Sequence, residues 1–332
     1  MSPKKLVRML TKAVQNEIQI LIKGAPGIGK TDIVLLVAKI TKMDVILMHP
    51  VVSDPTDFKG LPAIVNGKAC FLPYGQLRKL VETNKKTICF IDDAGQAPAT
   101  VQAALMQLVF GKTVNEHDIS NKIVFLAATN RREDRAHVTA ILEPLKSRFH
   151  SIVELIIDKG EWIEWALQND IVAEVIAFIN MNPDMLLTGK ATSEIINHPS
   201  PRMWKHVSDM IKAEILDLET AIGAVGEIAG AAFVGFLKVW TTLPDLDDLI
   251  ANPKRAAVPT EPSALYAIVS ALCKRIDKKN AENIFEYGKR LPNEFDTLLG
   301  LDAERKNPKI KETKGYCDWI IRHPEISSGM AA

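Results

Sequence analysis

The first half of the chain alternates short apolar runs with stretches of helical periodicity. The runs are rich in Ile, Val, Leu and Phe and lack strict alternation, which is typical of parallel strands covered on both faces. This order predicts an α/β domain built on a parallel sheet. The predicted strands are residues 18–22, 45–48, 87–91, 123–127 and 151–155.

A hairpin is predicted between the second and third strands, near residues 61–71. Asn66-Gly67 lies there between two apolar arms, and this dipeptide favours a tight turn in which both central residues need φ > 0. The hairpin interrupts the strand–helix order. We therefore interpret it as an insertion rather than as part of the main sheet.

Helical periodicity replaces the strand signals after residue 158. Ser200-Pro201 predicts a helix start, with Ser as N-cap and Pro at the first helical position. Residues 243–262 hold four prolines and several acidic side chains, so we expect a linker or an extended crossing there. Ser263 is predicted to cap a final helical region that runs toward the C-terminus.

The charge balance and the cysteines indicate which partners and which cellular compartment to expect. The chain of 332 residues has 41 Lys+Arg and 40 Asp+Glu, so no overall basic field points to nucleic acid, although local basic clusters leave that partner open. The four cysteines lie far apart, and the N-terminus lacks the apolar region of a signal peptide. We expect a cytoplasmic protein. The seven histidines show no metal-ligand spacing, so no second active site is predicted.

One apolar segment, residues 221–237, is a candidate membrane span. It contains Gly226 and Gly230 in a G-x-x-x-G motif, which also lets soluble helices pack closely. Glu227 interrupts the run, which is short for a bilayer. We therefore expect no membrane association.

The strongest chemical motif is a complete G-x-x-x-x-G-K-T between the first predicted strand and a predicted helix over residues 32–42. Glycines let successive backbone N–H groups point at phosphate oxygens, and the helix start adds the positive end of its dipole. Lys30 is expected to lie on a solvent-accessible loop and to reach the β- and γ-phosphates of ATP, while Thr31 ligates Mg²⁺. The predicted nucleotide-binding residues of the loop are Gly24, Ala25, Pro26, Gly27, Ile28, Gly29, Lys30 and Thr31.

Two further strands end in polar side chains. The strand 87–91 runs into Asp92-Asp93, and the strand 123–127 leads to Asn130. Parallel strands bind ligands at their carboxyl ends, so Asp92 is placed to hold Mg²⁺ through water and Asp93 to polarise an attacking water. Asn130 could orient that water or contact the γ-phosphate, although Asn after a strand is often turn chemistry.

These motifs, in this order, resemble AAA+ ATPases. Ser147-Arg148-Phe149 and then Ser200-Pro201-Arg202 continue the resemblance. The segment 54–60, Asp-Pro-Thr-Asp-Phe-Lys-Gly, and the hairpin after it look specifically like the MoxR-like branch, which inserts a hairpin in its second helix. The resemblance covers about residues 15–215.

The resemblance implies a five-stranded parallel-sheet P-loop AAA+ core over residues 1–157, a helical lid over 158–242 and a helical C-terminal extension over 243–332. It also implies roles at matching positions. Asn130 matches the first sensor, Arg148 the arginine finger that acts on a neighbouring subunit, and Arg202 the second sensor in the lid. Further interface candidates, which a solvated basic turn explains equally well, are Arg131, Arg132 and Arg135.

The function expected from this resemblance is ATP binding and hydrolysis at the subunit interfaces of a ring, expected to be a hexamer, which remodels or assembles a partner protein. A partner carrying a von Willebrand factor A domain is expected, because the MoxR-like branch often works with one. One departure concerns Asp93, where the family usually has Glu. The shorter side chain leaves open a scaffold gated by ATP with slow hydrolysis, and a nucleic-acid motor or loader is a second alternative.

Overall fold

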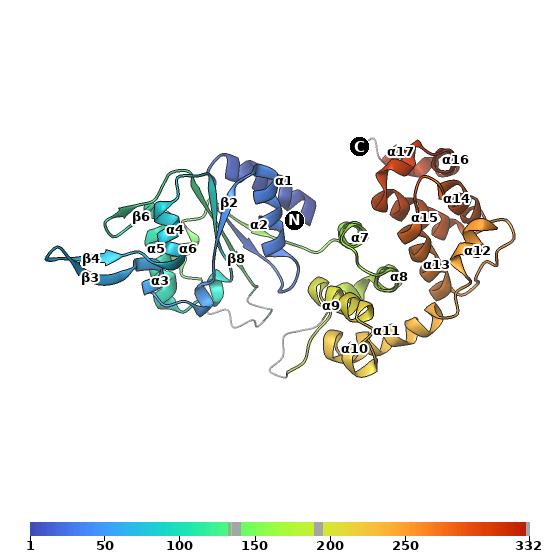
Figure 1. The fold of residues 1–332 in the computed structure, drawn as a ribbon, viewed down its shortest axis with the longest axis horizontal. Helices are drawn as coiled ribbons and strands as arrows, with labels where there is room; N and C mark the ends of the chain where they lie inside the picture. Colours follow the sequence, from blue (N-terminus) through green and yellow to red (C-terminus); the bar gives the residue numbers. More distant parts are fainter. Residues whose placement is uncertain (132–133, 135–140, 189–194, 330–332) are drawn as a thin grey trace. The chain divides into compact units, whose positions relative to one another are not determined.

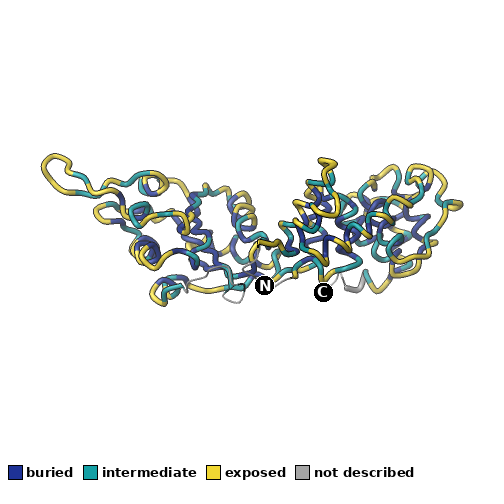
Figure 2. The backbone as a smooth tube through the Cα atoms, turned by 90° about the horizontal axis from the view of Figure 1, so that it is seen from below, coloured by how far each residue is buried: buried dark blue, intermediate teal, exposed yellow. Residues whose placement is uncertain are grey.

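The computed structural model describes residues 1–131, 134, 141–188 and 195–329 (Figure 1). The chain divides into two compact units, of which the first holds Met1–Asp158 and the second holds the described residues from Lys159 onward. Each unit has its own buried interior (Figure 2). The separation of the second unit into a lid and an extension remains a prediction.

The first unit is built on a five-stranded parallel sheet in the order β2-β5-β8-β1-β9. The predicted five-stranded parallel core is therefore confirmed, and the sheet order places β5, β8 and β1 side by side at its centre. The strands are β1 Ile20–Lys23, β2 Asp44–Met48, β5 Thr87–Ile91, β8 Ile123–Thr129 and β9 Ser151–Glu154.

The central strands are apolar throughout because helices cover both faces of the sheet. Every residue of β5 and β8 is buried, as expected for parallel strands between two helical layers. Figure 1 shows α1 and α2 on one side of the sheet and α4 and α5 on the other. These helices are α1 Pro3–Gln15, α2 Lys30–Thr41, α4 Gly75–Glu82 and α5 Ala99–Gly111, and the shorter α3 Thr56–Lys59 and α6 Glu143–Lys146 lie in the same unit.

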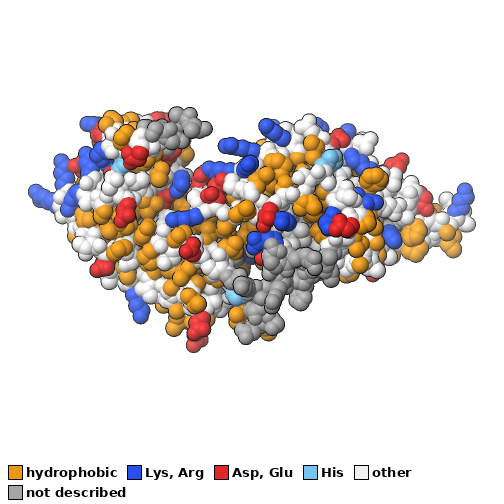
Figure 3. All heavy atoms as spheres, turned by 180° about the vertical axis from the view of Figure 1, so that it is seen from behind, with side chains coloured by type: hydrophobic (Ala, Val, Ile, Leu, Met, Phe, Trp, Pro, Cys, Tyr) orange, Lys and Arg blue, Asp and Glu red, His pale blue; other side chains and the backbone are white. Residues whose placement is uncertain are grey.

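Two hairpins lie outside the main sheet. The predicted one forms from β3 Leu61–Val65 and β4 Lys68–Leu72, with φ of 52° at Asn66 and 76° at Gly67. This hairpin protrudes from the first unit and carries exposed apolar side chains (Figure 3). The sequence analysis missed the second, β6 Thr113–Val114 with β7 His117–Asp118, because arms of two residues carry no periodic signal.

The second unit is entirely helical where it is described. Four aromatic rings, Phe178, Trp204, Phe233 and Phe236, pack together in one part of its core, and α13 packs against α8 and α15 elsewhere. The helices are α7 Lys159–Gln168, α8 Ala173–Met181, α9 Pro201–Lys212, α10 Leu218–Val225, α11 Glu227–Trp240, α12 Leu246–Ala251, α13 Pro262–Arg275, α14 Ala281–Gly288, α15 Asn293–Lys306, α16 Lys314–Arg322 and α17 Pro324–Gly329.

The local sequence signals predicted some helix starts of this unit correctly and others wrongly. The Ser200 hydroxyl accepts a hydrogen bond of 3.3 Å from the Met203 backbone N–H, so the predicted cap of α9 is confirmed. The prediction for 243–262 was incomplete, because Asp245 caps the short helix α12 within it through the Asp247 N–H. The prediction for Ser263 was wrong, because α13 already begins at Pro262 and Ser263 lies inside the helix.

The candidate membrane segment forms two helices rather than one. Gly226, with φ of 80°, ends α10 and precedes α11. A Cβ on Gly230 would lie 2.7 Å from the Ile222 backbone nitrogen, so the glycine is needed for close approach of the two helices. In the described parts of the chain, no helix is long and apolar enough to cross a membrane.

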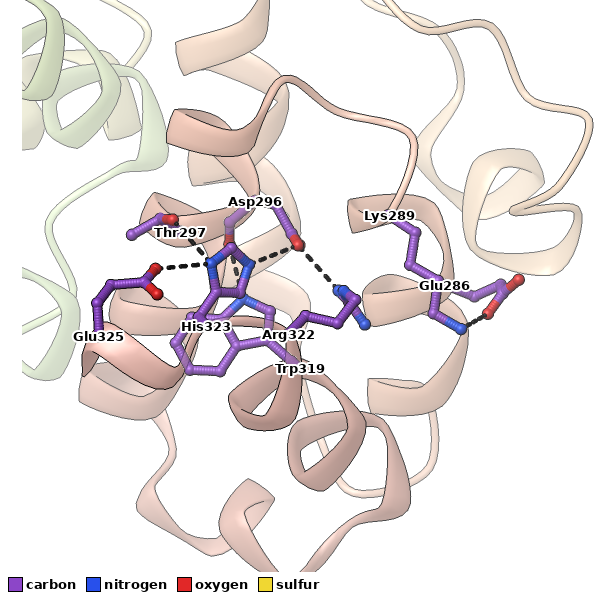
Figure 4. A network of polar contacts seen from close by, with 8 residues as sticks. All are labelled: Glu286, Lys289, Asp296, Thr297, Trp319, Arg322, His323 and Glu325. Atoms are coloured by element: carbon purple, nitrogen blue, oxygen red, sulfur yellow. Dashed lines mark hydrogen bonds and ion pairs between the residues drawn. The ribbon is translucent and has the colours of Figure 1, made fainter. Parts of the chain in front are cut away.

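A buried polar network holds the C-terminal helices of the second unit together (Figure 4). The Asp296 Oδ2 atom lies 2.9 Å from His323 Nε2 and 2.9 Å from Arg322 Nη2. The Trp319 indole N–H donates to the Asp296 carbonyl oxygen at 2.9 Å. The Oδ2 atom of the buried carboxylate is thus matched by a cation and by one imidazole nitrogen, which lowers the cost of its burial.

The Trp319 ring also requires a glycine inside α15. A Cβ added to Gly300 would lie 2.0 Å from Trp319 ring carbons, whereas one added to Gly235 in α11 would meet no atom within 4 Å. All five tryptophans lie at or after residue 162. Their fluorescence therefore reports unfolding of the second unit alone.

We predict opposite effects of two Gly→Ala substitutions. Gly300→Ala should destabilise the second unit by about 1–3 kcal/mol, because overpacking outweighs the gain in helix propensity. Gly235→Ala should stabilise it by about 0.4–1 kcal/mol, since no clash opposes that gain. Urea unfolding followed by tryptophan fluorescence measures both. A Gly300→Ala protein as stable as Gly235→Ala would contradict the packing.

Candidate nucleotide-binding site

The phosphate loop joins β1 to α2, and its backbone needs glycine at several positions. Gly27 and Gly29 have φ of 73° and 90°, values that residues with a Cβ rarely adopt. A Cβ on Gly24 would lie 2.8 Å from the Ile28 side chain and 3.1 Å from the Leu155 carbonyl oxygen. The Gly24 N–H donates to the Thr129 carbonyl oxygen at 3.2 Å, which ties the loop to the end of β8.

The loop ends at the N-terminus of α2. Gly29 is the N-cap and, having no side chain, provides no capping bond. The first backbone N–H groups of a helix have no partners within the helix. Together with the helix dipole they make a site suited to a phosphate.

Lys30 differs from the expectation of a solvent-accessible side chain. The residue is only 7% exposed. Its ammonium group donates to the Gly24 and Ala25 carbonyl oxygens at 3.0 and 2.9 Å and to Asn130 Oδ1 at 2.6 Å. A buried cation needs such acceptors, and the curled loop supplies two of them. The sequence could not reveal this, because the third acceptor, Asn130, follows β8 and is 100 residues away along the chain.

Thr31 and Asp92 come together at the adjacent strand end. The Thr31 hydroxyl donates to Asp92 Oδ2 at 2.7 Å. Asp92 is buried, and its backbone N–H donates to the Met48 carbonyl oxygen on β2. A hydroxyl and a carboxylate oxygen are hard ligands that suit Mg²⁺. The residues therefore fit the predicted Mg²⁺ site, with Thr31 and Asp92 as its holders.

Asp93 lies beside these groups in an unusual backbone conformation. Its φ is 54° and its ψ is 35°, in the left-handed region that Asp and Asn tolerate better than most residues. Its Oδ1 atom accepts hydrogen bonds from Gln96 Nε2 at 2.8 Å and from Asn130 Nδ2 at 3.5 Å. The amide of Asn130 thus spans from Lys30 to Asp93.

Sequence reasoning missed two residues that support Asp93. Gln96 belongs to the 3₁₀ turn η2, Ala94–Gln96, that follows Asp93, and a lone Gln in a turn carries no signal. Gly95 lies so close to β8 that a Cβ would be 2.3 Å from the Thr129 hydroxyl oxygen. This close approach places the segment after β5 against the end of β8.

The predicted arginines do not join this group of side chains. Arg148 Nε donates to the Met106 carbonyl oxygen at 2.9 Å, and its Nη1 donates to Pro144 O. Arg202 is exposed near the start of α9, in the second unit. The roles predicted for Arg148 and Arg202 therefore remain predictions.

Arg131 pairs within its own unit. It forms a bidentate contact with Asp134 and lies 3.6 Å from Glu154. Lys23, at 3.0 Å, and then Arg131 lower the pKa of Glu154. A role for Arg131 between subunits would require it to leave this ion-pair network. The other two candidates, Arg132 and Arg135, lie outside the described residues.

One family model matches the part of the chain that holds this site. Residues 19–149 match the family model described as AAA domain (dynein-related subfamily), a range that includes the phosphate loop, Asp92, Asp93, Asn130 and Arg148. The match supports the P-loop AAA+ fold and ATP hydrolase activity for this domain. No curated protein matches the chain.

Solved structures resemble the chain only at low identity. A RuvB mutant from Thermotoga maritima is 17% identical, with 96% of this chain and 86% of that chain covered and a TM-score of 0.38. NtrX from Brucella abortus is 12% identical, with 93% and 67% covered and a TM-score of 0.43. At such scores these likenesses carry no argument about substrate or partner.

We predict that Lys30→Ala abolishes ATP binding or turnover. The substitution removes the cation that faces the phosphates and also its three bonds to the loop and Asn130. Isothermal titration with Mg-ATP and a steady-state phosphate-release assay measure both effects. Lys30→Met, which keeps the apolar stem, should behave alike, while Lys39→Ala on the exposed face of α2 should bind normally. Full ATP affinity and turnover in a folded Lys30→Ala protein would refute the site.

Proposed function

We propose that the chain is a MoxR-like AAA+ ATPase that binds Mg-ATP at this site and hydrolyses it between subunits of a ring. The observation that carries the proposal is the connected group of polar side chains at three neighbouring strand ends. Lys30, Asn130 and Asp93 form one hydrogen-bonded chain, and Thr31 and Asp92 form a second pair beside it. A phosphate cation, a metal-ligand pair and a carboxylate base are the groups that phosphoryl transfer to water needs.

In this proposal the phosphate loop binds the phosphates of ATP. A phosphate oxygen would compete with the Gly24 and Ala25 carbonyls and with Asn130 for the Lys30 ammonium group. Bound Mg²⁺ would neutralise charge on the phosphates. Thr31 and Asp92 offer the oxygens that hold it, and the Asp92 backbone is anchored to β2.

Water activation falls to Asp93. The carboxylate lies two residues after the end of β5, and Gln96 and Asn130 donate hydrogen bonds to its Oδ1 atom. Within the described part of the chain, Oδ2 accepts no hydrogen bond, and we assign to this atom the acceptance of a proton from water. Asn130 spans Lys30 and Asp93, so a change at the phosphates is passed to the carboxylate through a single side chain.

The proposed client is a protein, and a ring, expected to be a hexamer, is the proposed assembly. The protruding hairpin β3–β4 supports a protein client, because Ile64 is 80% exposed and Leu61, Val65 and Leu72 are exposed beside it (Figure 3). Exposed apolar patches are typical of protein contacts. A partner with a von Willebrand factor A domain and a cytoplasmic location belong to the same proposal.

A nucleic-acid motor is the second candidate function. It is favoured by a shallow hollow at the start of β2, β5 and β8. Four lysines line this hollow together with Asp44 and Asn84, and they are Lys42, Lys85, Lys86 and Lys122. Lysines that neutralise phosphates give binding that weakens steeply with salt. Binding to DNA that falls with salt and stimulates ATP hydrolysis would favour this candidate over a protein client.

We predict that Asp93→Asn retains Mg-ATP binding but lowers kcat by about 100-fold or more, the scale of losing a positioned base. Asn tolerates the same left-handed backbone, so the fold should be unchanged. Asp93→Glu restores the length that the family uses and should preserve or raise kcat, even though a longer residue at φ of 54° costs about 1 kcal/mol of stability. An unchanged kcat in Asp93→Asn would remove Asp93 from the mechanism.

We predict that Arg148→Ala loses turnover far more than ATP affinity. Arginine fingers stabilise charge only in the transition state and contribute about 10³–10⁵ in rate in other NTPases. Steady-state kinetics and nucleotide titration separate the two effects.

Mixing Arg148→Ala with Lys30→Ala subunits tests the sharing of sites. Each variant is expected to be inactive alone, and activity should return where an intact Lys30 site meets Arg148 from the other variant. Wild-type activity per subunit should fall on dilution to monomer. Normal hydrolysis by Arg148→Ala, or dilution without loss, would contradict a shared site.

A further inference from the structure

Arg148 is held by the C-terminal end of α5 before any neighbour is present. Its guanidinium carbon lies 5.1 Å from the centroid of the Phe110 ring. Nε donates to the Met106 carbonyl oxygen at 2.9 Å, and Nη1 donates to Pro144 O. Among the residues that the structure describes, Nη2 makes no hydrogen bond. The group is therefore oriented by three contacts and keeps one N–H₂ edge available.

Phe110 is an unusual residue for its position. It is 75% exposed although α5 is otherwise largely buried on the side that packs in the core. Met106 and Phe110 are four residues apart and so share one face of the helix. Arg148 contacts the Met106 carbonyl oxygen and the Phe110 ring. The negative end of the helix dipole adds a third attraction for a cation at this end.

We propose that Phe110 is the positioning residue for Arg148, and this inference rests on the proposed function. An arginine side chain has several rotatable bonds, and an exposed one samples many rotamers. The Phe110 ring beneath the guanidinium carbon and the two carbonyl oxygens that accept its N–H groups restrict the side chain to one orientation. The remaining Nη2 edge then meets the neighbour's phosphate without a further loss of rotamer freedom, which raises kcat rather than ATP affinity.

The ring must act as an aromatic surface and not merely as apolar cover. Cation–π attraction depends on the negative face of the ring. Leu at position 110 fills similar space but has no such face, whereas Tyr keeps it. The two substitutions therefore separate positioning from packing.

The test compares variants in the assembled protein, with assembly checked by light scattering. Phe110→Ala should lower kcat by about 3- to 30-fold with KM for ATP unchanged, the range set by one cation–π contact. Phe110→Leu should be impaired in the same way, and Phe110→Tyr should restore kcat. Ile321→Ala is the matched control, because Ile321 is also 75% exposed but lies in α16.

Mixed subunits show where the defect acts. Lys30→Ala subunits carry an intact Phe110 and Arg148, so adding them should raise the rate per intact Lys30 site of Phe110→Ala subunits. Wild-type kcat in assembled Phe110→Ala or Phe110→Leu, or a change in KM alone, would overturn the positioning role. If Phe110→Ala fails to assemble, Phe110→Leu decides the same question.

Different results would contradict the shared site and the positioning role of Phe110. If Arg148→Ala is inactive while the Phe110 variants are normal, the shared site stands and the positioning role is wrong. If Arg148→Ala hydrolyses ATP at the wild-type rate, the shared site itself is wrong.

Discussion

The hydrogen bond of 2.6 Å between the Lys30 ammonium group and Asn130 connects the phosphate loop to the rest of the site. It is possible only because β1 and β8 are neighbours in a parallel sheet, so that their carboxyl ends lie at one edge. The second end of the Asn130 amide reaches Asp93. One side chain thus links Lys30, the group proposed to face the phosphates, with Asp93, the group proposed to face the water.

The segment after β5 connects the hydrogen-bonded group of Lys30, Asn130 and Asp93 to the surface of the first unit. Asp93 is supported by Gln96, the next turn leads into α5, and α5 ends at Phe110 beside Arg148. A helix of 13 residues is about 20 Å long and stiff. The turn that carries Gln96 precedes the N-terminal end of this helix, and the arginine proposed to act on a neighbour lies at its C-terminal end.

Glycine permits close approach wherever these elements meet. Gly95 lets the turn after Asp93 lie against Thr129, and Gly230 and Gly300 let helices of the second unit pack on a backbone and on the Trp319 ring. In each case a Cβ would lie less than 3 Å from another atom. Such contacts are long-range in sequence, so a glycine that looks like a weak helix or turn residue is instead a packing requirement.

The sequence by itself determined the features that depend on neighbouring residues. Apolar runs specified the five strands, the spacing of Gly, Lys and Thr specified the phosphate loop, and Asn66-Gly67 specified a turn, because periodicity and φ limits act within a few residues. Only the tertiary structure decided the burial of Lys30, the support of Asp93 by Gln96 and the contact of the Phe110 ring with Arg148. Each of these joins separate elements, and the strand order and helix packing that bring them together arise from long-range burial, which no local pattern encodes.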